Sequence, residues 1–249
     1  MSEVKERPIL FSTPMVRAVL DDRKTKTRRT LKPAMVEAIE TYLGGDNETE
    51  LAFAYLDNVK DEGGSKAPVG WYVWCAEYPE EGVFPIGQCP YGKVGDRLWV
   101  REEHKIWQYK QVGNQCETWV CEYRDGTVIE KYAKEIPLAT VQKLRKRKTL
   151  GKWQRARFLP KAFCRILLEI TDIRVERLQD IFEEDAIAEG VEIHSSNRLF
   201  NFYKSYTPDR VCFNNPIDSF RTLWQSINGL ESWAANPWVP VISFRRVEA

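Results

Sequence analysis

The sequence predicts an α+β fold built around a partly closed, mostly antiparallel β-barrel, with flanking helices and large loop insertions. Three observations indicate this class. Helical and strand-like segments are intermixed without the regular βαβ repeat of a parallel sheet. Neither a G-x-G-x-x-G nor a P-loop pattern is present. Several short strand-like segments are separated by turn residues, as in small barrels.

Size, charge and hydropathy narrow the class of protein further. The 249 residues are enough for a buried core in one elaborated domain or in two small ones. A net charge of +1 exerts no long-range attraction on phosphate or on a membrane surface, so any polyanion has to bind locally. No apolar run reaches the roughly 20 residues that span a bilayer. Because MSEVKERP also lacks the apolar segment of a signal peptide, we expect a cytoplasmic protein without membrane contact.

The cysteines and histidines do not form a recognisable metal pattern. The six cysteines are too scattered for a disulfide scaffold, and we expect free thiols in a reducing compartment. Cys116 and Cys121 are separated by four residues, and His104 and His194 lie far apart, so we expect no metal and no cofactor. His104 is interpreted as a surface residue after a strand; the alternative is a role in orienting or protonating a substrate.

The N-terminal segment predicts a strand and a helix that leads into a basic stretch. The strand is expected at Ile9–Phe11, followed by a helix with Thr13 as its cap and Pro14 at its first position. Within the following DDRKTKTRRTLKP, four of the six positions from Lys24 to Arg29 are basic, at the exit of this helix where the helix dipole tolerates them. A solvated turn and a ligand-binding segment both fit this composition.

The middle of the chain alternates between turn-rich and strand-like sequence. Residues 44–90 contain the glycine and proline of turns around the aromatic run WYVW, which indicates an insertion. A strand is expected from Arg97 to Arg101, with Leu98 and Val100 on one face. A hairpin is expected around Asp125–Gly126.

Residues 143–157 contain the highest density of basic side chains. Cations around an aromatic ring are typical of single-stranded nucleic-acid binding, with phosphates on the cations and a base on the ring. A solvated loop is the alternative, since many basic segments bind nothing. The candidate nucleic-acid-binding residues are Lys146, Arg147, Lys148, Lys152, Trp153 and Arg155.

The C-terminal half carries the strongest strand and helix patterns. RILLEITDIRVERL alternates and is rich in branched apolar residues, which predicts a strand of the central sheet. LQDIFEEDAIAEG predicts a short helix that stops at Gly190. Glu189 is unusual there, because a carboxylate in the last turn faces the negative end of the helix dipole; this suggests another use for it.

The last elements are a helix and a strand. Asn215 is expected to cap the helix and Pro216 to open it. Apolar residues at helical spacing predict a face that packs on the sheet, and NPWVPVISFRRV predicts the final strand. The residues of the apolar stripe are Phe220, Leu223, Trp224 and Ile227.

Taken in order, these segments resemble the ASCH domains, small barrels of the PUA-like superfamily. The resemblance is carried by DRKTKTRR after a helix, by GDRLWV, by DAIAEGV after a strand and by a last strand ending in FRR. The first block is similar to the G-x-K-x-x-E-x-R signature, with Lys24 at the lysine and Arg29 at the arginine. Asp22 stands where glycine is usual, and Thr27 where glutamate is usual.

These departures resemble one branch of the family, the bacterial N4-acetylcytidine amidohydrolases. Lys24, Thr25, Thr27 and Arg29 match a K-T-x-T-x-R pattern, and Ala186 with Glu189 matches A-x-x-E. The resemblance implies Lys24, Thr27 and Glu189 as the catalytic set, with Thr25, Arg28 and Arg29 as substrate-binding residues. The whole chain also resembles phage and prophage proteins of this superfamily.

The resemblance implies a single ASCH-like domain over residues 1–249. Its core is expected at about 7–43, 91–106 and 158–248, and its insertions at about 44–90, 107–157 and 192–214. Three functions remain open: a hydrolase of a modified nucleoside or nucleobase, a PUA-like module that binds RNA or a nucleotide, and a ribonuclease. The expected ligand is therefore a nucleoside or RNA. The ribonuclease fits worst, because no cluster of carboxylates for a metal ion is evident.

Overall fold

The computed structural model describes residues 4–44, 49–56, 70–78, 83–110, 117–197 and 200–248. The chain forms two compact units, which are described separately. Unit 1 consists of Met1–Asp22, Asp96–Glu169 and Arg245–Ala249. Unit 2 consists of Arg23–Gly95 and Ile170–Phe244.

A central sheet with the strand order β1-β6-β11-β15-β2 contributes strands to both units. In unit 1, β1 (Glu6–Leu10) pairs in parallel with β6 (Arg97–Arg101), and β6 pairs antiparallel with the start of β11 (Leu167–Arg177). In unit 2, β15 (Trp238–Val247) pairs antiparallel with β2 (Lys26–Arg28). The expected strands around Ile9, at 97–101, in RILLEITDIRVERL and near the C-terminus are thus confirmed.

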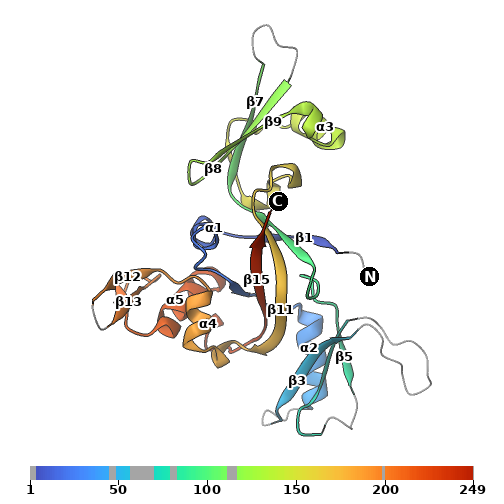
Figure 1. Ribbon diagram of the computed structural model, residues 1–249. Helices are drawn as coiled ribbons and strands as arrows, with labels where there is room; N and C mark the ends of the chain where they lie inside the picture. Colours follow the sequence, from blue (N-terminus) through green and yellow to red (C-terminus); the bar gives the residue numbers. More distant parts are fainter. Residues whose placement is uncertain are drawn as a thin grey trace, which may run out of the picture. The chain divides into compact units, whose positions relative to one another are not determined.

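Three small antiparallel sheets lie in the segments expected as insertions (Figure 1). The first contains β3 (Leu51–Leu56), β4 (Gly70–Cys75) and β5 (Phe84–Gly87). The second contains β7 (His104–Lys110), β8 (Glu117–Tyr123), β9 (Val128–Tyr132) and β10 (Trp153–Gln154). The third contains β12 (Ile193–Ser196), β13 (Asn201–Lys204) and β14 (Cys212–Phe213). The turn between β8 and β9 confirms the hairpin predicted around Asp125–Gly126.

Five α-helices accompany these sheets within the described residues. They are α1 (Thr13–Leu20), α2 (Pro33–Leu43), α3 (Leu138–Arg145), α4 (Glu183–Ala188) and α5 (Pro216–Asn228). Asn215 caps α5 as predicted, since its side chain accepts a hydrogen bond from the amide of Ile217. The cap of α1 is Ser12 instead of Thr13, because Ser12 has the extended backbone of a cap and Thr13 already belongs to the helix.

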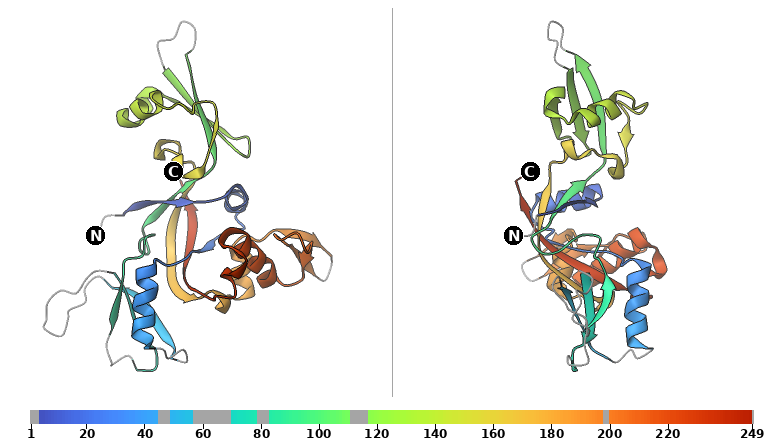
Figure 2. Two further views of the ribbon diagram at one scale, coloured as in Figure 1. Left: turned by 180° about the vertical axis from the view of Figure 1, so that it is seen from behind. Right: turned by 90° about the vertical axis from the view of Figure 1, so that its right-hand side faces the viewer.

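Each unit has its own buried core. In unit 1, α3 packs beside the β7–β10 sheet, around Trp119, Tyr123 and Leu144 (Figure 2). In unit 2, α4 and α5 pack around Phe220 and Trp224. The apolar stripe predicted for α5 is wrong at its end: the side chain of Ile227 is 51% exposed because it lies in the last turn of the helix.

The mixed α+β class is confirmed, whereas a barrel is not. The strand order of the central sheet has two ends, and no closed barrel forms among the described residues. Within the same residues, no helix is long and apolar enough to cross a membrane. Cys75, Cys121, Cys164 and Cys212 are free thiols, as expected. Cys116 lies outside the described residues.

The prediction for His104 in unit 1 is wrong. His104 was expected at the surface, but the residue is completely buried. Strand β7 begins at this residue, and its pairing with Tyr123 of β8 turns the ring toward the core. The alternation of a strand in sequence does not reveal which of its two faces is covered.

Candidate functional site

A buried ion pair between Lys24 and Glu189 is the centre of the candidate site in unit 2. The two residues are 165 positions apart in the sequence, and the Lys24 Nζ donates to Glu189 Oε2 at 2.8 Å. Lys24 Nζ also donates to the backbone carbonyls of Glu189 and Lys26, each at 2.8 Å. The Lys24 side chain is fully shielded from solvent. Three acceptors thus match the three protons of the ammonium group.

Glu189 is held in place by the end of helix α4. It is the C-cap of this helix, and Gly190 follows in the left-handed conformation (φ 87°) that ends the helix. The second carboxylate oxygen, Oε1, accepts from the backbone amide of Arg28 at 2.6 Å. The carboxylate therefore turns away from the helix axis toward β2, which gives its unusual position in the sequence a structural explanation.

The pair covers one edge of β2. Lys26 O and Arg28 N, the two backbone groups that it binds, flank Thr27 along the strand. On the other edge of β2, Thr27 pairs with Ile242 of β15. Since an uncovered edge strand is a template for unwanted pairing, the pair has a structural use independent of any chemistry.

Thr27 is buried but is not joined to the pair through its side chain. The hydroxyl makes no hydrogen bond to Lys24 or Glu189 among the described residues, and 1% of the residue is exposed. Successive side chains of a strand point to opposite faces. Lys26 and Arg28 both contact Asp185, so the side chain of Thr27 points to the other face of β2.

Arg28 is fully engaged by carboxylates of unit 2. Its guanidinium donates to Glu176 at 2.6 Å, to Asp185 at 2.7 Å and to Glu189 at 3.4 Å. Asp185 also accepts from Lys26 and Arg174. These cations outweigh the effect of burial and lower the pKa of Asp185 to about 2. Much of the charge in KTKTRR thus belongs to an internal ion-pair network.

The protonation of Lys24 is set by two opposing effects. Burial lowers the pKa of its ammonium group, because a charged group loses hydration, while the Glu189 carboxylate raises it. The net direction is downward from the usual value. Lys24 is therefore easier to deprotonate than a lysine on the surface.

The other two predicted substrate-binding residues flank this network. Thr25 is exposed, and its amide donates to the carbonyl of Ala188 at 2.9 Å. Burial lowers the pKa of the Arg29 guanidinium, an effect that Tyr91 and Glu189 oppose. The structure therefore brings Lys24, Arg28 and Glu189 into direct contact and places Arg29 within electrostatic range of Glu189.

The predicted nucleic-acid-binding residues belong to unit 1, between α3 and the segment after β10. Lys146, Lys148, Lys152, Trp153 and Arg155 are exposed, whereas Arg147 is half-buried and donates to the carbonyl of Phe158 at 2.8 Å.

Two cations contact the Trp153 ring. The Arg124 guanidinium carbon lies 4.0 Å and the Lys105 Nζ 5.5 Å from its centroid. Neither cation was predicted, because each joins Trp153 only through the folding of the β7–β10 sheet.

Sequence reasoning also missed Arg174, Glu176 and Asp185. A weak signal was present: Arg174 and Glu176 alternate on one face of β11, and Asp185 is one of three acidic residues in the first turn of α4. No group of three or more His, Cys, Asp and Glu side chains is arranged to hold a metal ion in the described part of the chain. No protein-family model, curated protein or solved structure matches the chain.

Proposed function

We propose that this protein is an ASCH-type hydrolase that cleaves the amide of a modified nucleoside or nucleobase, with N4-acetylcytidine as the model substrate. The observation that carries the proposal is the buried contact between Lys24 and Glu189. These are the two residues that the resemblance pairs as catalytic, and 165 positions separate them in the sequence. The proposal includes a single ASCH-like domain with a PUA-like core. It also includes a cytoplasmic location.

Amide hydrolysis needs a nucleophile, a base and stabilisation of an oxyanion. In the proposed reaction, Lys24 first transfers a proton to Glu189, which leaves a neutral amine and a neutral acid. Lys24 then accepts a proton from a water molecule, or from the Thr27 hydroxyl, as the oxygen attacks the acetyl carbon. Glu189 returns its proton to the departing cytosine amine as the carbon–nitrogen bond breaks. If Thr27 attacks, a water molecule then releases acetate from the acyl-enzyme.

Arg29 has the charge needed to stabilise the oxyanion, and Thr25 is the exposed polar group next to the pair. Arg28 is proposed to bind substrate only indirectly, by holding Glu189, since its guanidinium already binds three carboxylates.

The test is release of cytidine from N4-acetylcytidine, free and within RNA, followed by chromatography. Wild type should release cytidine and acetate, while Lys24→Ala and Glu189→Gln should lose at least the 10²-fold that general acid–base catalysis contributes. Lys26→Met is the matched control, because Lys26 is a lysine two residues from Lys24 whose side chain binds Asp185, outside the catalytic set. Because the pair also covers the edge of β2, each variant is compared by circular dichroism. Turnover retained in folded Lys24→Ala and Glu189→Gln contradicts the proposal.

RNA binding is the second candidate function. It is favoured by the exposed basic side chains around Trp153, a residue that is itself 36% exposed. Cations and an aromatic face are what a single strand uses. We expect Kd for a single-stranded RNA to rise steeply with salt, and Trp153→Leu with Lys152→Gln to weaken binding. RNA binding that is absent, or insensitive to salt, contradicts this function.

A further inference from the structure

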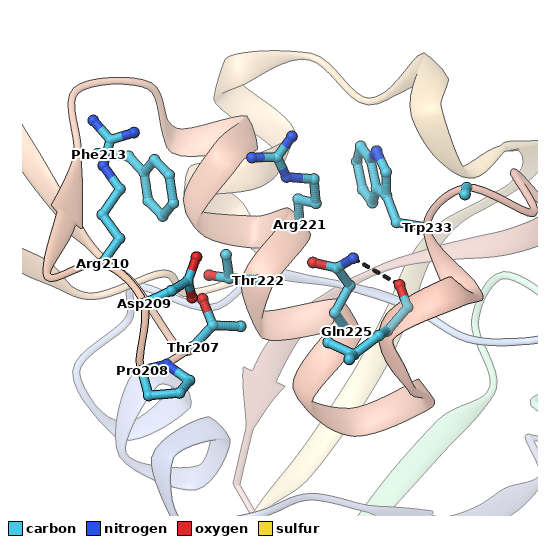
Figure 3. A pocket seen from close by; sticks show the side chains of 11 residues that line it. Thr207, Pro208, Asp209, Arg210, Phe213, Arg221, Thr222, Gln225 and Trp233 are labelled. Carbon is cyan, nitrogen blue, oxygen red and sulfur yellow. Dashed lines mark hydrogen bonds between the residues drawn. The ribbon is translucent and has the colours of Figure 1, made fainter.

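A cavity of about 650 Å³ lies in unit 2 beside α5 (Figure 3), and none of the residues proposed for hydrolysis lines it. Its volume is within the range of small-molecule sites. It is bounded by α5, by the segment between β13 and β14, and by the turn after α5. The residues that matter for its chemistry are Asp209, Arg210, Phe213, Arg221, Gln225 and Trp233.

We propose that this cavity binds a guanine nucleotide. The inference goes beyond the proposed hydrolase, because it concerns a separate site and none of the residues involved belongs to the catalytic set. It follows from three features of the lining: two guanidinium groups, an aromatic wall and a carboxylate that offers only acceptors, with a glutamine of α5 that offers a further acceptor.

The two guanidinium groups form the part of the cavity suited to phosphate. Arg221 extends from α5 between Phe213 and Trp233 (Figure 3). Its ion pair with Asp218, at 3.2 Å, is well exposed to solvent and thus weak enough to exchange for a ligand. Arg210 donates through Nε to the carbonyl of Cys212 at 2.9 Å and stacks on Phe213 at 4.6 Å.

These contacts orient Arg210 without using its terminal nitrogens. Among the described residues, no carboxylate forms an ion pair with Arg210. A guanidinium fork presents paired donors that match phosphate oxygens.

Trp233 forms the aromatic wall on the opposite side of Arg221 (Figure 3). The ring is half-buried and packs edge-on against Phe220, with 6.3 Å between ring centroids and an interplanar angle of 72°. This contact holds the ring in place, and a nucleobase can stack on such a ring at little cost in conformational freedom.

The choice of guanine comes from Asp209 and Gln225. The Gln225 Nε2 donates one of its two N–H groups to the carbonyl of Leu230 at 2.7 Å, and its Oε1 is an acceptor. A hydrogen bond from Thr207, together with nearby cations, lowers the pKa of Asp209, so its carboxylate offers only acceptors. Guanine presents adjacent ring N–H and amino donors on one edge, whereas adenine presents an acceptor there. The Asp209 carboxylate, with two acceptor oxygens, therefore favours guanine.

Isothermal titration calorimetry with guanosine 5′-monophosphate tests the proposal, with adenosine 5′-monophosphate, guanosine and inorganic phosphate as comparison ligands. We expect the guanine nucleotide to bind about tenfold more tightly than the adenine nucleotide, the discrimination expected of one good polar pair. Equal affinity for both nucleotides, or no binding of the guanine nucleotide at millimolar concentration, overturns the proposal.

Variants assign the two halves of the site. Asp209→Asn should remove the preference for guanine, and Arg221→Gln should weaken nucleotide binding while leaving guanosine binding unchanged. Arg246→Gln, which removes an exposed arginine outside the cavity, is the matched control and should change neither. Both test residues are on the surface, and a melting curve confirms that each variant folds. Unchanged nucleotide affinity and preference in both variants refute this site. Catalysis plays no part in the measurement, so its outcome is independent of the hydrolase proposal.

Discussion

The buried ring of His104 makes the stability of unit 1 depend on pH. Its Nδ1 lies 3.1 Å from the carbonyl of Glu102, so the neutral ring donates there and carries its lone pair on Nε2. Nε2 has no hydrogen-bond partner among the described residues. Protonation would place a charge in the core, near the guanidinium of Arg147. Burial is the main reason that the pKa of His104 falls from 6.5 to about 4.

The size and sign of the effect follow from this shift. Below pH 6.5 the unfolded chain binds a proton at His104, while the folded chain stays neutral down to about pH 4. The stabilisation is therefore complete above pH 6.5 and is lost as the pH falls through 4. Each pKa unit corresponds to 1.36 kcal/mol, so the loss approaches about 3 kcal/mol. This is a large fraction of the roughly 5–15 kcal/mol that stabilises a domain.

Urea unfolding between pH 7.5 and pH 4 measures this loss in wild type and in His104→Asn. The asparagine amide can still donate to the carbonyl of Glu102 but does not titrate. Between pH 7.5 and pH 4, the unfolding free energy of His104→Asn should therefore fall by about 3 kcal/mol less than that of wild type. Amide hydrogen exchange in β7 and β8 assigns the change to unit 1. His194→Asn is the control, since His194 is exposed and is the only other histidine. Equal pH slopes for wild type and His104→Asn, or a proton NMR titration of the ring above pH 6, would refute the reasoning.

Three other perturbations have defined outcomes. Lys24→Met should lower the unfolding free energy by about 3–5 kcal/mol, because it leaves Glu189 buried without its cation; the double variant with Glu189→Met should recover much of this in a double-mutant cycle. Asp185→Asn should lower the unfolding free energy by about 2 kcal/mol above pH 4 and cause no additional loss near pH 2, because the pKa of the Asp185 carboxyl is about 2 in the folded chain and 3.8 in the unfolded chain. An acid titration in which wild type and variant differ by the same unfolding free energy at every pH would contradict this. Asn215→Ala should cost about 0.5–2 kcal/mol through loss of the cap of α5, measured by urea unfolding, whereas Asn215→Gly should cost only a few tenths.

The elements that could be predicted are those with strong local patterns. The alternation in RILLEITDIRVERL and the Asp125–Gly126 turn correspond to β11 and the β8–β9 hairpin. Asn215 and Pro216 mark the start of α5 correctly. In these cases, the deciding interactions join residues a few positions apart, so the pattern itself carries the information.

The candidate site could be predicted only in part. Lys24 and Glu189 were named from motifs, and Glu189 also from its unfavourable place on the helix dipole. Their contact depends on α4 meeting β2, which no local pattern encodes. The roles of Arg174 and Glu176 depend on the same long-range packing.

By itself, the sequence determined where most strands and helices form, because hydrophobic period, caps and turn residues act over short distances. Only the tertiary structure decided which of these segments meet. It buried His104, which was expected at the surface, and joined Lys24 to a carboxylate 165 positions away. Burial and pairing of a charge depend on what covers it, and that covering comes from segments distant in the chain. The pKa values of the site are therefore properties of the fold.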